Sequence, residues 1–361
     1  MKVAAHHLES LDVFRGLTVA AMMLVNNPGD WSAVFPPLLH AYWTGWTFAD
    51  VVFPWFIFVM GVAMPFAFSR RRTGGHALRQ VYTRIARRVV ALSVLGLMLN
   101  AVAAWPAVTP LRFPGVLQRI ALAYAIAAPI VLHLDETAWA VAIAILLAGH
   151  SALLMFVPFA GYPAGTLRPE HNLPRFVDAA VFGRHLLLMP IDPEGLLGTI
   201  TAAASALCGA LAGAALQRAR DSGARPWTLA VGGIAAVLAG IAWSWRLPIS
   251  KPLWTGPFVL LTSGLAAIAL AAIYVVVDVR GLRRWSMPFL WLGVNPIAMY
   301  CLSEIVGHLQ TSPKAWIYWT ILEPVMPDAP AVASLLFGLA FVAMWAAVAG
   351  VLYRRHIRIQ V

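Results

Sequence analysis

Residues 254–277 read WTGPFVLLTSGLAAIALAAIYVVV and contain no charged side chain. A helix needs about 20 mainly apolar residues to cross the ~30 Å hydrocarbon core of a bilayer, and this stretch is long enough. In lipid, every backbone N–H and C=O must be satisfied by the chain itself, which a helix achieves and an open strand does not. The stretch therefore predicts a transmembrane helix.

Nine further apolar segments along the chain are roughly long enough to span a bilayer. We therefore predict an all-α fold, namely a polytopic membrane helix bundle of about ten transmembrane helices that forms a single domain over residues 1–361. The ten predicted segments are 11–27, 50–68, 89–105, 114–133, 137–158, 196–216, 227–245, 254–277, 286–309 and 331–353.

The composition of the 361-residue chain excludes a soluble globular protein. Hydrophobic residues make up 61% and charged residues 11%, whereas a typical soluble domain holds about 45–50% and about 25%. The same hydrophobicity excludes intrinsic disorder, which requires few apolar residues. The formal net charge is +11, but no basic-aromatic motif typical of nucleic-acid binding is present, so we expect no nucleic-acid partner.

The arginines indicate how the chain crosses the membrane. They gather in alternate loops, and cytoplasmic loops of membrane proteins carry an excess of Lys and Arg, so both termini are predicted to be cytoplasmic. The first apolar run ends in Asn26-Asn27-Pro28-Gly29 without a small-residue cleavage site. We therefore expect a retained first helix rather than a removed signal peptide. The basic clusters predicted to be cytoplasmic lie within residues 69–88, 218–225, 280–284 and 354–358.

The loops predicted to face away from the cytoplasm differ in kind from the basic ones. Residues 28–49, 159–195 and 310–330 are long and rich in Pro, Trp and His. Long loops with aromatic and titratable side chains often carry function, although most of the tryptophans fit an interfacial aromatic belt. Function is therefore expected on this side of the membrane.

His40 and Asp50 are the clearest pair of candidate residues in these loops. His40 lies in the first long loop, and Asp50 opens the second apolar segment. An Asp beside a His fixes the ring tautomer and raises its basicity, as in general-base catalysis. Asp50 also suits the first turn of a helix for structural reasons alone, and spacing by itself does not bring the two side chains together.

Asp12 and Arg15 stand one helical turn apart at the start of the first segment. As an i, i+3 pair they could neutralise each other, which is a structural role. The alternative is that Arg15 meets a phosphate-bearing ligand from the cytoplasm.

Several classes of protein are excluded by the motifs that the sequence lacks. It contains no P-loop, no dinucleotide glycine fingerprint and no nucleophile elbow, which argues against an ATP-driven pump and an ordinary serine hydrolase. Glu304 and His308 are spaced i, i+4 but have no evident third ligand, so we expect no metal. Cys208 and Cys301 lie inside apolar segments and are expected to be inert.

Six sequence blocks resemble one family, the transmembrane acyltransferases that comprise heparan-alpha-glucosaminide N-acetyltransferase and its bacterial, NagX-like relatives. The blocks occur in the family's order, and several are long and contain rare residues. They are LDVFRGLTVAAMMLVNNPG (11–29), LLHAYWTGWTFADVVFPWFIFVMG (38–61), FPGVLQRI (113–120), DPEGLLGTI (192–200), PISKPLW (248–254) and LGVNPIAMY (292–300).

The resemblance implies transfer of an acetyl group from acetyl-CoA, made in the cytoplasm, to an amino sugar of the glucosamine type on the far side of the membrane. It places the family's active-site histidine at His40, within the pattern HA-x-W-x-G, an asparagine at Asn26 and an aspartate at Asp50. His40 would either carry the acetyl group or act as a general base, and the sequence does not choose between these roles. Asn26 or Asn27 would stabilise the oxyanion.

Other polar residues are candidates for holding the two substrates. For the acceptor they are Asn27, Trp43, Asp192, Glu194 and Asn295. For acetyl-CoA, which is a co-substrate with several phosphates, they are Arg15, Gln118, Arg119 and Lys251, because Arg suits phosphate.

Two other functions fit a bundle with polar groups at membrane depth. One is a transporter or permease for a sugar or muropeptide fragment, although no internal repeat is evident. The other is a non-catalytic membrane partner of a sugar-uptake system. For an acetyltransferase we expect a multi-pass protein of the bacterial inner membrane, with a homodimer as one allowed state.

Overall fold

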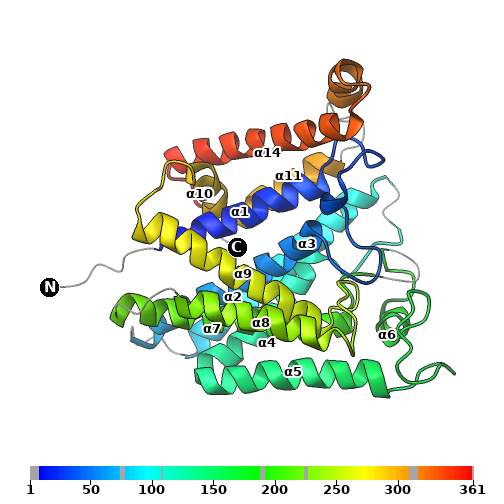
Figure 1. The fold of residues 1–361 in the computed structure, drawn as a ribbon, viewed down its shortest axis with the longest axis vertical. Coiled ribbons are helices and arrows are strands. Elements are labelled where there is room, and N and C mark those ends of the chain that lie inside the picture. Colours follow the sequence, from blue (N-terminus) through cyan, green and yellow to red (C-terminus); the bar gives the residue numbers. More distant parts are fainter. Residues whose placement is uncertain are drawn as a thin grey trace. The chain divides into compact units, whose positions relative to one another are not determined.

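The computed structural model describes residues 8–73, 78–106, 109–187, 192–222, 227–308 and 316–359, and within these ranges the chain is helical with no β-strand (Figure 1). The all-α prediction is therefore confirmed. The helices are α1 (Glu9–Asn26), η1 (Pro36–Leu38), α2 (Phe48–Thr73), α3 (Leu78–Ala104), α4 (Val116–His133), α5 (Glu136–Phe156), α6 (Leu173–Phe182), α7 (Leu196–Ser222), α8 (Trp227–Trp243), α9 (Gly256–Tyr274), η2 (Val275–Val279), α10 (Met287–Val294), α11 (Pro296–His308), η3 (Tyr318–Leu322), α13 (Glu323–Val325) and α14 (Pro330–Arg354).

Among the residues that the structure describes, fewer helices have the length and composition of a membrane span than the sequence predicted. In the described ranges, seven helices are long and apolar enough to cross a membrane, or eight if the bent pair α10–α11 counts as one span. The remaining two predicted segments are helical but differ from the others: α8 has 17 residues, and α1 has Glu9, Asp12 and Arg15 among its 18. The chain is thus a multi-pass membrane protein, and a count of ten is not confirmed.

The chain forms two compact units, and α2 and α9 each pass from one to the other. The first unit comprises Met1–His40, Thr47–Phe56 and Ile268–Gln360. The second comprises Ala41–Trp46, Ile57–Ala267 and Val361. A single domain over the whole chain stays a prediction.

In the first unit, α1 packs closely on α10, with α11 and α14 beside them (Figure 1). Two glycines allow this approach: a Cβ added at Gly16 would overlap the carbonyl of Phe289, and one at Gly293 would overlap that of Asp12. Small residues let helix backbones meet in this way in membranes, where lipid gives helices no hydrophobic reason to associate. The charged start of α1 is thereby tied to α10.

A 90° bend separates α10 from α11 at Asn295-Pro296. Proline disfavours helical geometry in the residue before it, which ends α10, and its fixed φ suits the first position of α11. The side chain of Asn295 faces the C-terminal tail: Nδ2 donates to the Ile357 carbonyl at 3.0 Å, and the Ile359 N–H donates to Oδ1 at 2.7 Å. The side chain at the bend therefore also holds the segment that contains Ile357 and Ile359.

The second unit is built around α7. This helix contacts α4 and α5 on one part of its surface and the later half of α2 on another, where a Cβ added at Gly209 would overlap the carbonyl of Phe58. By contrast, α3 and α5 expose apolar side chains such as Val94 and Ile145. Apolar residues on the outside and small residues at the contacts are what lipid as a solvent favours.

Candidate active site

His40 and Asp50 are in contact in the first unit, as the sequence suggested. His40 Nδ1 lies 2.9 Å from Asp50 Oδ1. The aspartate side chain is fully buried, whereas 47% of the histidine side chain is exposed. The pair thus combines a carboxylate shielded from water with an imidazole that a substrate can approach.

The start of α2 fixes the Asp50 carboxylate. Asp50 is the third residue of the helix, and its Oδ2 accepts a hydrogen bond from the backbone N–H of Thr47 at 3.0 Å. An acidic side chain here satisfies a backbone donor that the helix leaves unpaired and interacts favourably with the helix dipole. One oxygen is therefore used by the helix, and the other faces His40.

A rigid turn leads into His40. Pro36 and Pro37 belong to η1, which limits the backbone angles of this segment. The N–H of Leu39 donates to the Pro36 carbonyl at 3.2 Å. The loop before this turn is attached to α14, because Ser334 Oγ accepts from the Asp30 N–H at 3.1 Å. His40 thus follows a constrained segment of chain.

The geometry suits either proton transfer or acyl transfer at the imidazole. With Asp50 as acceptor, the neutral ring carries its proton on Nδ1, and the lone pair lies on Nε2. A negative charge beside Nδ1 also stabilises the ring when Nε2 gains a proton or an acyl group. Both roles considered for His40 use this arrangement.

The two asparagines that end α1 have different surroundings. Asn26 Nδ2 donates to Glu304 Oε1 at 3.0 Å. Asn27 is buried, and its Nδ2 donates to the Met23 carbonyl at 3.0 Å. Glu304 thus orients the amide of Asn26, whereas the amide of Asn27 bonds back to its own helix. The predicted catalytic role of Asn26 and binding role of Asn27 stay predictions.

Arg15 forms the predicted pair with Asp12. Its Nη1 lies 2.7 Å from Asp12 Oδ1 and 3.5 Å from the carbonyl of Gly293 on α10. The predicted contact between the two side chains is therefore confirmed, and contact of Arg15 with acetyl-CoA stays a prediction.

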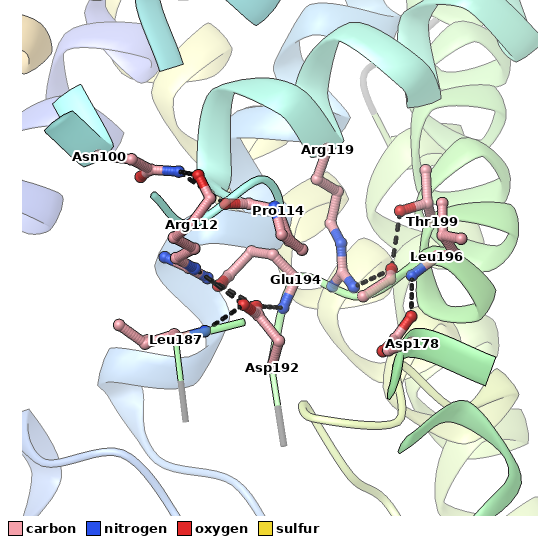
Figure 2. Close-up of polar contacts among 11 residues, drawn as sticks. Asn100, Arg112, Pro114, Arg119, Asp178, Leu187, Asp192, Glu194, Leu196 and Thr199 are labelled. Carbon is pink, nitrogen blue, oxygen red and sulfur yellow. Dashed lines mark hydrogen bonds and ion pairs between the residues drawn. The ribbon is translucent and has the colours of Figure 1, made fainter. Parts of the chain in front are cut away.

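The second unit holds a buried ionic cluster made by Arg112, Asp192 and Glu194 (Figure 2). Arg112 binds both oxygens of Asp192, from Nε at 2.8 Å and from Nη2 at 2.6 Å, and also pairs with Glu194. The backbone N–H groups of Leu187 and Glu194 donate to the same carboxylate. Asp192 is thus saturated by its own chain, and its predicted binding of substrate stays untested.

Charge and burial shift the pKa values in this cluster. Burial acts to lower the pKa of Arg112, but Asp192 and Glu194 outweigh it and hold the pKa above its ordinary value. Burial acts to raise the pKa of Asp192, and the hydrogen bonds and charge of Arg112 outweigh it, so this pKa is lowered. The cluster is therefore an ion pair at neutral pH.

Two further groups hold the start of α7 beside this cluster (Figure 2). Arg119 Nη2 donates to the Gly195 carbonyl at 2.9 Å, and Asp178 Oδ1 accepts from the Leu196 N–H at 2.8 Å. Burial raises the pKa of Asp178 to about 6, against the opposing effect of its hydrogen bond with Leu196. The block DPEGLLGTI is therefore a helix start clamped from two sides.

The remaining candidates of the second unit are placed as follows. The Arg119 guanidinium stacks over Trp254 at 4.7 Å, and the Gln118 amide packs against Gly96 of α3. Trp43 Nε1 donates to the Leu167 carbonyl at 2.8 Å. The carbonyl of Lys251 accepts from the Trp254 N–H. Contact with acetyl-CoA stays a prediction for Gln118, Arg119 and Lys251. Contact with the acceptor stays a prediction for Trp43, Glu194 and Asn295.

Within the residues that the structure describes, no group of three or more His, Cys, Asp and Glu could hold a metal ion. Glu304 and His308 do lie close, with His308 Nδ1 3.8 Å from Glu304 Oε2. The second oxygen of Glu304 is used by Asn26. This carboxylate therefore connects α11 to the end of α1.

Comparison with known proteins agrees with the motifs. A sequence model described as "Heparan-alpha-glucosaminide N-acetyltransferase, catalytic" matches residues 8–166. Heparan-alpha-glucosaminide N-acetyltransferase of Mus musculus is 28% identical over 98% of this chain and 60% of its own length. The protein of that name from Homo sapiens is 28% identical over 97% of this chain and 59% of its own.

Over nearly its whole length the chain is similar to the heparan-alpha-glucosaminide N-acetyltransferases. The resemblance predicted from the six blocks is thus confirmed. The chain spans about 60% of the length of these curated relatives. The matched region of the family's catalytic model includes His40, Asp50, Arg112 and Arg119.

Sequence reasoning missed residues whose partners are set by the fold. Arg112 is one of many loop arginines and has no local motif of its own, yet it pairs with Asp192 across 80 positions of sequence. Asp178 gave no signal beyond its place in a long loop. Thr47 did carry one, because a threonine three residues before an acid marks a helix start.

Proposed function

We propose that this protein is a membrane-embedded acetyltransferase that moves an acetyl group from acetyl-CoA to the amino group of a glucosamine-type sugar. The donor is taken from the cytoplasm, and the acceptor is on the extracytoplasmic side, which for a bacterial chain is the outer face of the inner membrane. The observation that carries the proposal is the contact of exposed His40 with buried Asp50 at 2.9 Å, inside the region matched by the catalytic family model.

His40 supplies the reacting nitrogen. In the covalent route, Nε2 attacks the thioester carbonyl carbon, the C–S bond breaks, and the CoA thiolate leaves. The sugar amine then attacks the acetyl-imidazole, a C–N bond forms, and the amine loses a proton as the imidazole is released. In the direct route, Nε2 takes the amine proton while the amine attacks the thioester carbonyl carbon; the C–N bond forms, the C–S bond breaks, and the CoA thiolate leaves and can take the proton back from Nε2. Acetyl-imidazole formation requires that water be kept from the site.

Asp50 and Asn26 assist in both routes. Asp50 keeps the proton on Nδ1 and balances the positive charge that the ring gains in either step. The amide of Asn26, oriented by Glu304 through one N–H, offers its second N–H to the oxygen of the tetrahedral intermediate. Arg15 and the other basic candidates supply positive charge for the phosphates of CoA.

The test uses purified full-length protein in lipid nanodiscs with acetyl-CoA and glucosamine. We expect CoA release and N-acetylglucosamine formation in equal amounts, and loss of both in His40→Ala by at least about 10³-fold. The control is His171→Ala, since His171 bonds through its ring to Tyr162 in the other unit. Activity that persists in His40→Ala overturns the proposal.

The same preparation separates the two routes and the alternative function. In the covalent route, labelled CoA exchanges into acetyl-CoA before any sugar is added, and in the direct route it does not. A transporter would instead move labelled sugar into vesicles without acetyl-CoA and without chemical change. That outcome, with no acetylation, would replace the proposed function.

A further inference from the structure

We infer that Thr47 is a positioning residue for the His40–Asp50 pair, which deepens the proposed function and rests on it. Thr47 Oγ1 donates to the carbonyl of Leu39, the residue directly before His40, at 2.6 Å. Its backbone N–H donates to Asp50 Oδ2 at 3.0 Å. One residue therefore fixes the backbone before the base and the carboxylate that orients the base.

The hydroxyl hydrogen goes to Leu39. Thr47 Oγ1 also lies 3.2 Å from Asp50 Oδ2, but a hydroxyl has one hydrogen, and the contact with Leu39 is much shorter. O–H···O hydrogen bonds in proteins are most often about 2.7–2.8 Å long. The carboxylate consequently depends on the backbone N–H of Thr47, and the loop depends on its side chain.

Ordinary helix capping explains the bond from the Thr47 N–H to Asp50, but it does not explain the bond from the Thr47 hydroxyl to Leu39. A threonine before the first residue of a helix usually accepts a hydrogen bond from an N–H of the first turn through its side-chain oxygen. Here the Asp50 N–H is bonded to the backbone carbonyl of Thr47 at 3.1 Å, and the hydroxyl points as a donor to a residue outside the helix. The side chain thus acts on the loop that carries His40.

The contact closes the base of a loop. Leu39 and Thr47 flank residues 40–46, and the middle of that loop is held separately, since the Gly45 N–H donates to the Ile249 carbonyl at 2.9 Å. Leu39 is then bonded through both of its backbone groups, to Pro36 by its N–H and to Thr47 by its C=O. Without the second bond, the backbone directly before His40 is no longer tied to the start of α2 through Leu39.

A positioning role affects turnover more than binding. Misplacing a reacting group by about 1 Å can cost about a hundredfold in rate. Thr47→Val keeps the shape of the side chain and removes the hydroxyl. We expect kcat to fall by about tenfold to a hundredfold, while KM for acetyl-CoA and for glucosamine changes by less than about threefold.

Two matched variants make the test specific. Thr47→Ser restores the hydroxyl without the methyl group and should return kcat to within about threefold of the unmodified protein. Thr44→Val makes the same change at an exposed threonine three residues earlier and should leave kcat unchanged. A Thr47→Val variant with normal kcat, or a Thr47→Ser variant as slow as Thr47→Val, overturns the inference.

A spectroscopic readout keeps the inference testable apart from the reaction. ¹⁵N NMR of histidine-labelled protein, with His40→Gln used to identify the His40 signals, reports which ring nitrogen carries the proton. We expect the Nδ1–H form to dominate in the unmodified protein and a mixture of both forms in Thr47→Val. An unchanged form in Thr47→Val would contradict the inference. Activity retained in His40→Ala would instead contradict the proposed function.

Discussion

Two buried aspartates, one in each unit, hold a basic side chain in different ways. Asp50 and Asp192 each have side chains with no exposed surface, yet their partners differ: 47% of the His40 side chain is exposed, against 17% for Arg112. Arg112 engages both oxygens of Asp192, whereas His40 engages one oxygen of Asp50. The first pair presents a titratable ring, and the second encloses a permanent charge.

The difference separates a pair that can exchange a proton from a pair that cannot. An arginine keeps its charge at all accessible pH values, so burying it between two carboxylates gives a stable ion pair with no proton to move. A histidine changes charge near neutral pH and can accept and release a proton. An aspartate carboxylate thus faces a side chain that can exchange a proton in one unit and a permanent cation in the other.

The largest expected effect that tests this comparison is a loss of turnover in Asp50→Asn. The side-chain oxygen of Asn can still accept the Thr47 N–H, and this leaves its NH₂ group facing His40 Nδ1. The ring must then carry its proton on Nε2, the nitrogen that should react. We expect kcat to fall by about 10²–10⁴-fold with little loss of folded protein, as measured by turnover and by size-exclusion chromatography.

Asp30→Asn is the control for this change, because Asp30 bonds to Ser32 in an exposed turn. Its kcat should stay within about twofold. If Asp50→Asn turned over normally, or lost folded protein and activity in equal proportion, Asp50 would be a structural residue like Asp192.

The second effect concerns stability in the other unit. Arg112→Met removes the cation that binds Asp192 and Glu194 directly. Breaking a buried ion pair from one side costs about 3–5 kcal/mol. We expect a loss of this size in the free energy of unfolding, measured by denaturant titration in detergent micelles.

An exposed ion pair in the same unit offers the matched control. Arg218 pairs with Glu136, and their side chains are 59% and 39% exposed. Pairs in water contribute about 0–1 kcal/mol, so Arg218→Met should cost far less than Arg112→Met. Equal losses in the two variants would show that the enclosure of Arg112 has no energetic consequence.

The sequence predicted the fold class because lipid imposes a strong constraint. Long apolar runs must become helices, so the positions of the long apolar helices follow from hydropathy. The count of spans did not follow, since hydropathy also selects α1, which carries Glu9, Asp12 and Arg15, and α8, which has only 17 residues. The division into two units depends on contacts between distant segments and leaves no local signal.

The candidate site was predictable only where its residues are close in sequence. His40 and Asp50 are ten positions apart and lie within one long motif, so residue type and resemblance both pointed to them. Arg112 and Asp192 are 80 positions apart, and nothing local distinguishes Arg112 from other loop arginines. Thr47 could have been found, because its spacing to Asp50 is typical of a helix start, but the direction of its hydroxyl is a tertiary feature.

The smallest expected effect is a change in how the free energy of unfolding depends on pH, and it concerns Asp178. The pKa of Asp178 is raised to about 6, against an ordinary value of about 3.9, so the folded protein keeps this proton to a higher pH than the unfolded chain. The contribution to stability is then full below about pH 4, falls as pH rises to about 6, and stays constant above. The shift of about 2 units corresponds to about 3 kcal/mol at most.

Asp178→Asn removes the titration and keeps an oxygen for the Leu196 N–H. Between pH 4 and 6.5 the free energy of unfolding of the unmodified protein should therefore fall relative to that of the variant, by about 1–3 kcal/mol. Asp178→Leu is the second variant: it loses the hydrogen bond, so its stability should be lower than that of Asp178→Asn by about 1 kcal/mol at every pH in this range. If the curves of the unmodified protein and Asp178→Asn ran parallel, the carboxyl of Asp178 would not be held protonated by its surroundings. Asp178, which holds the start of α7 through the Leu196 N–H, would then stay charged over this pH range, as the neighbouring Arg112–Asp192 pair does.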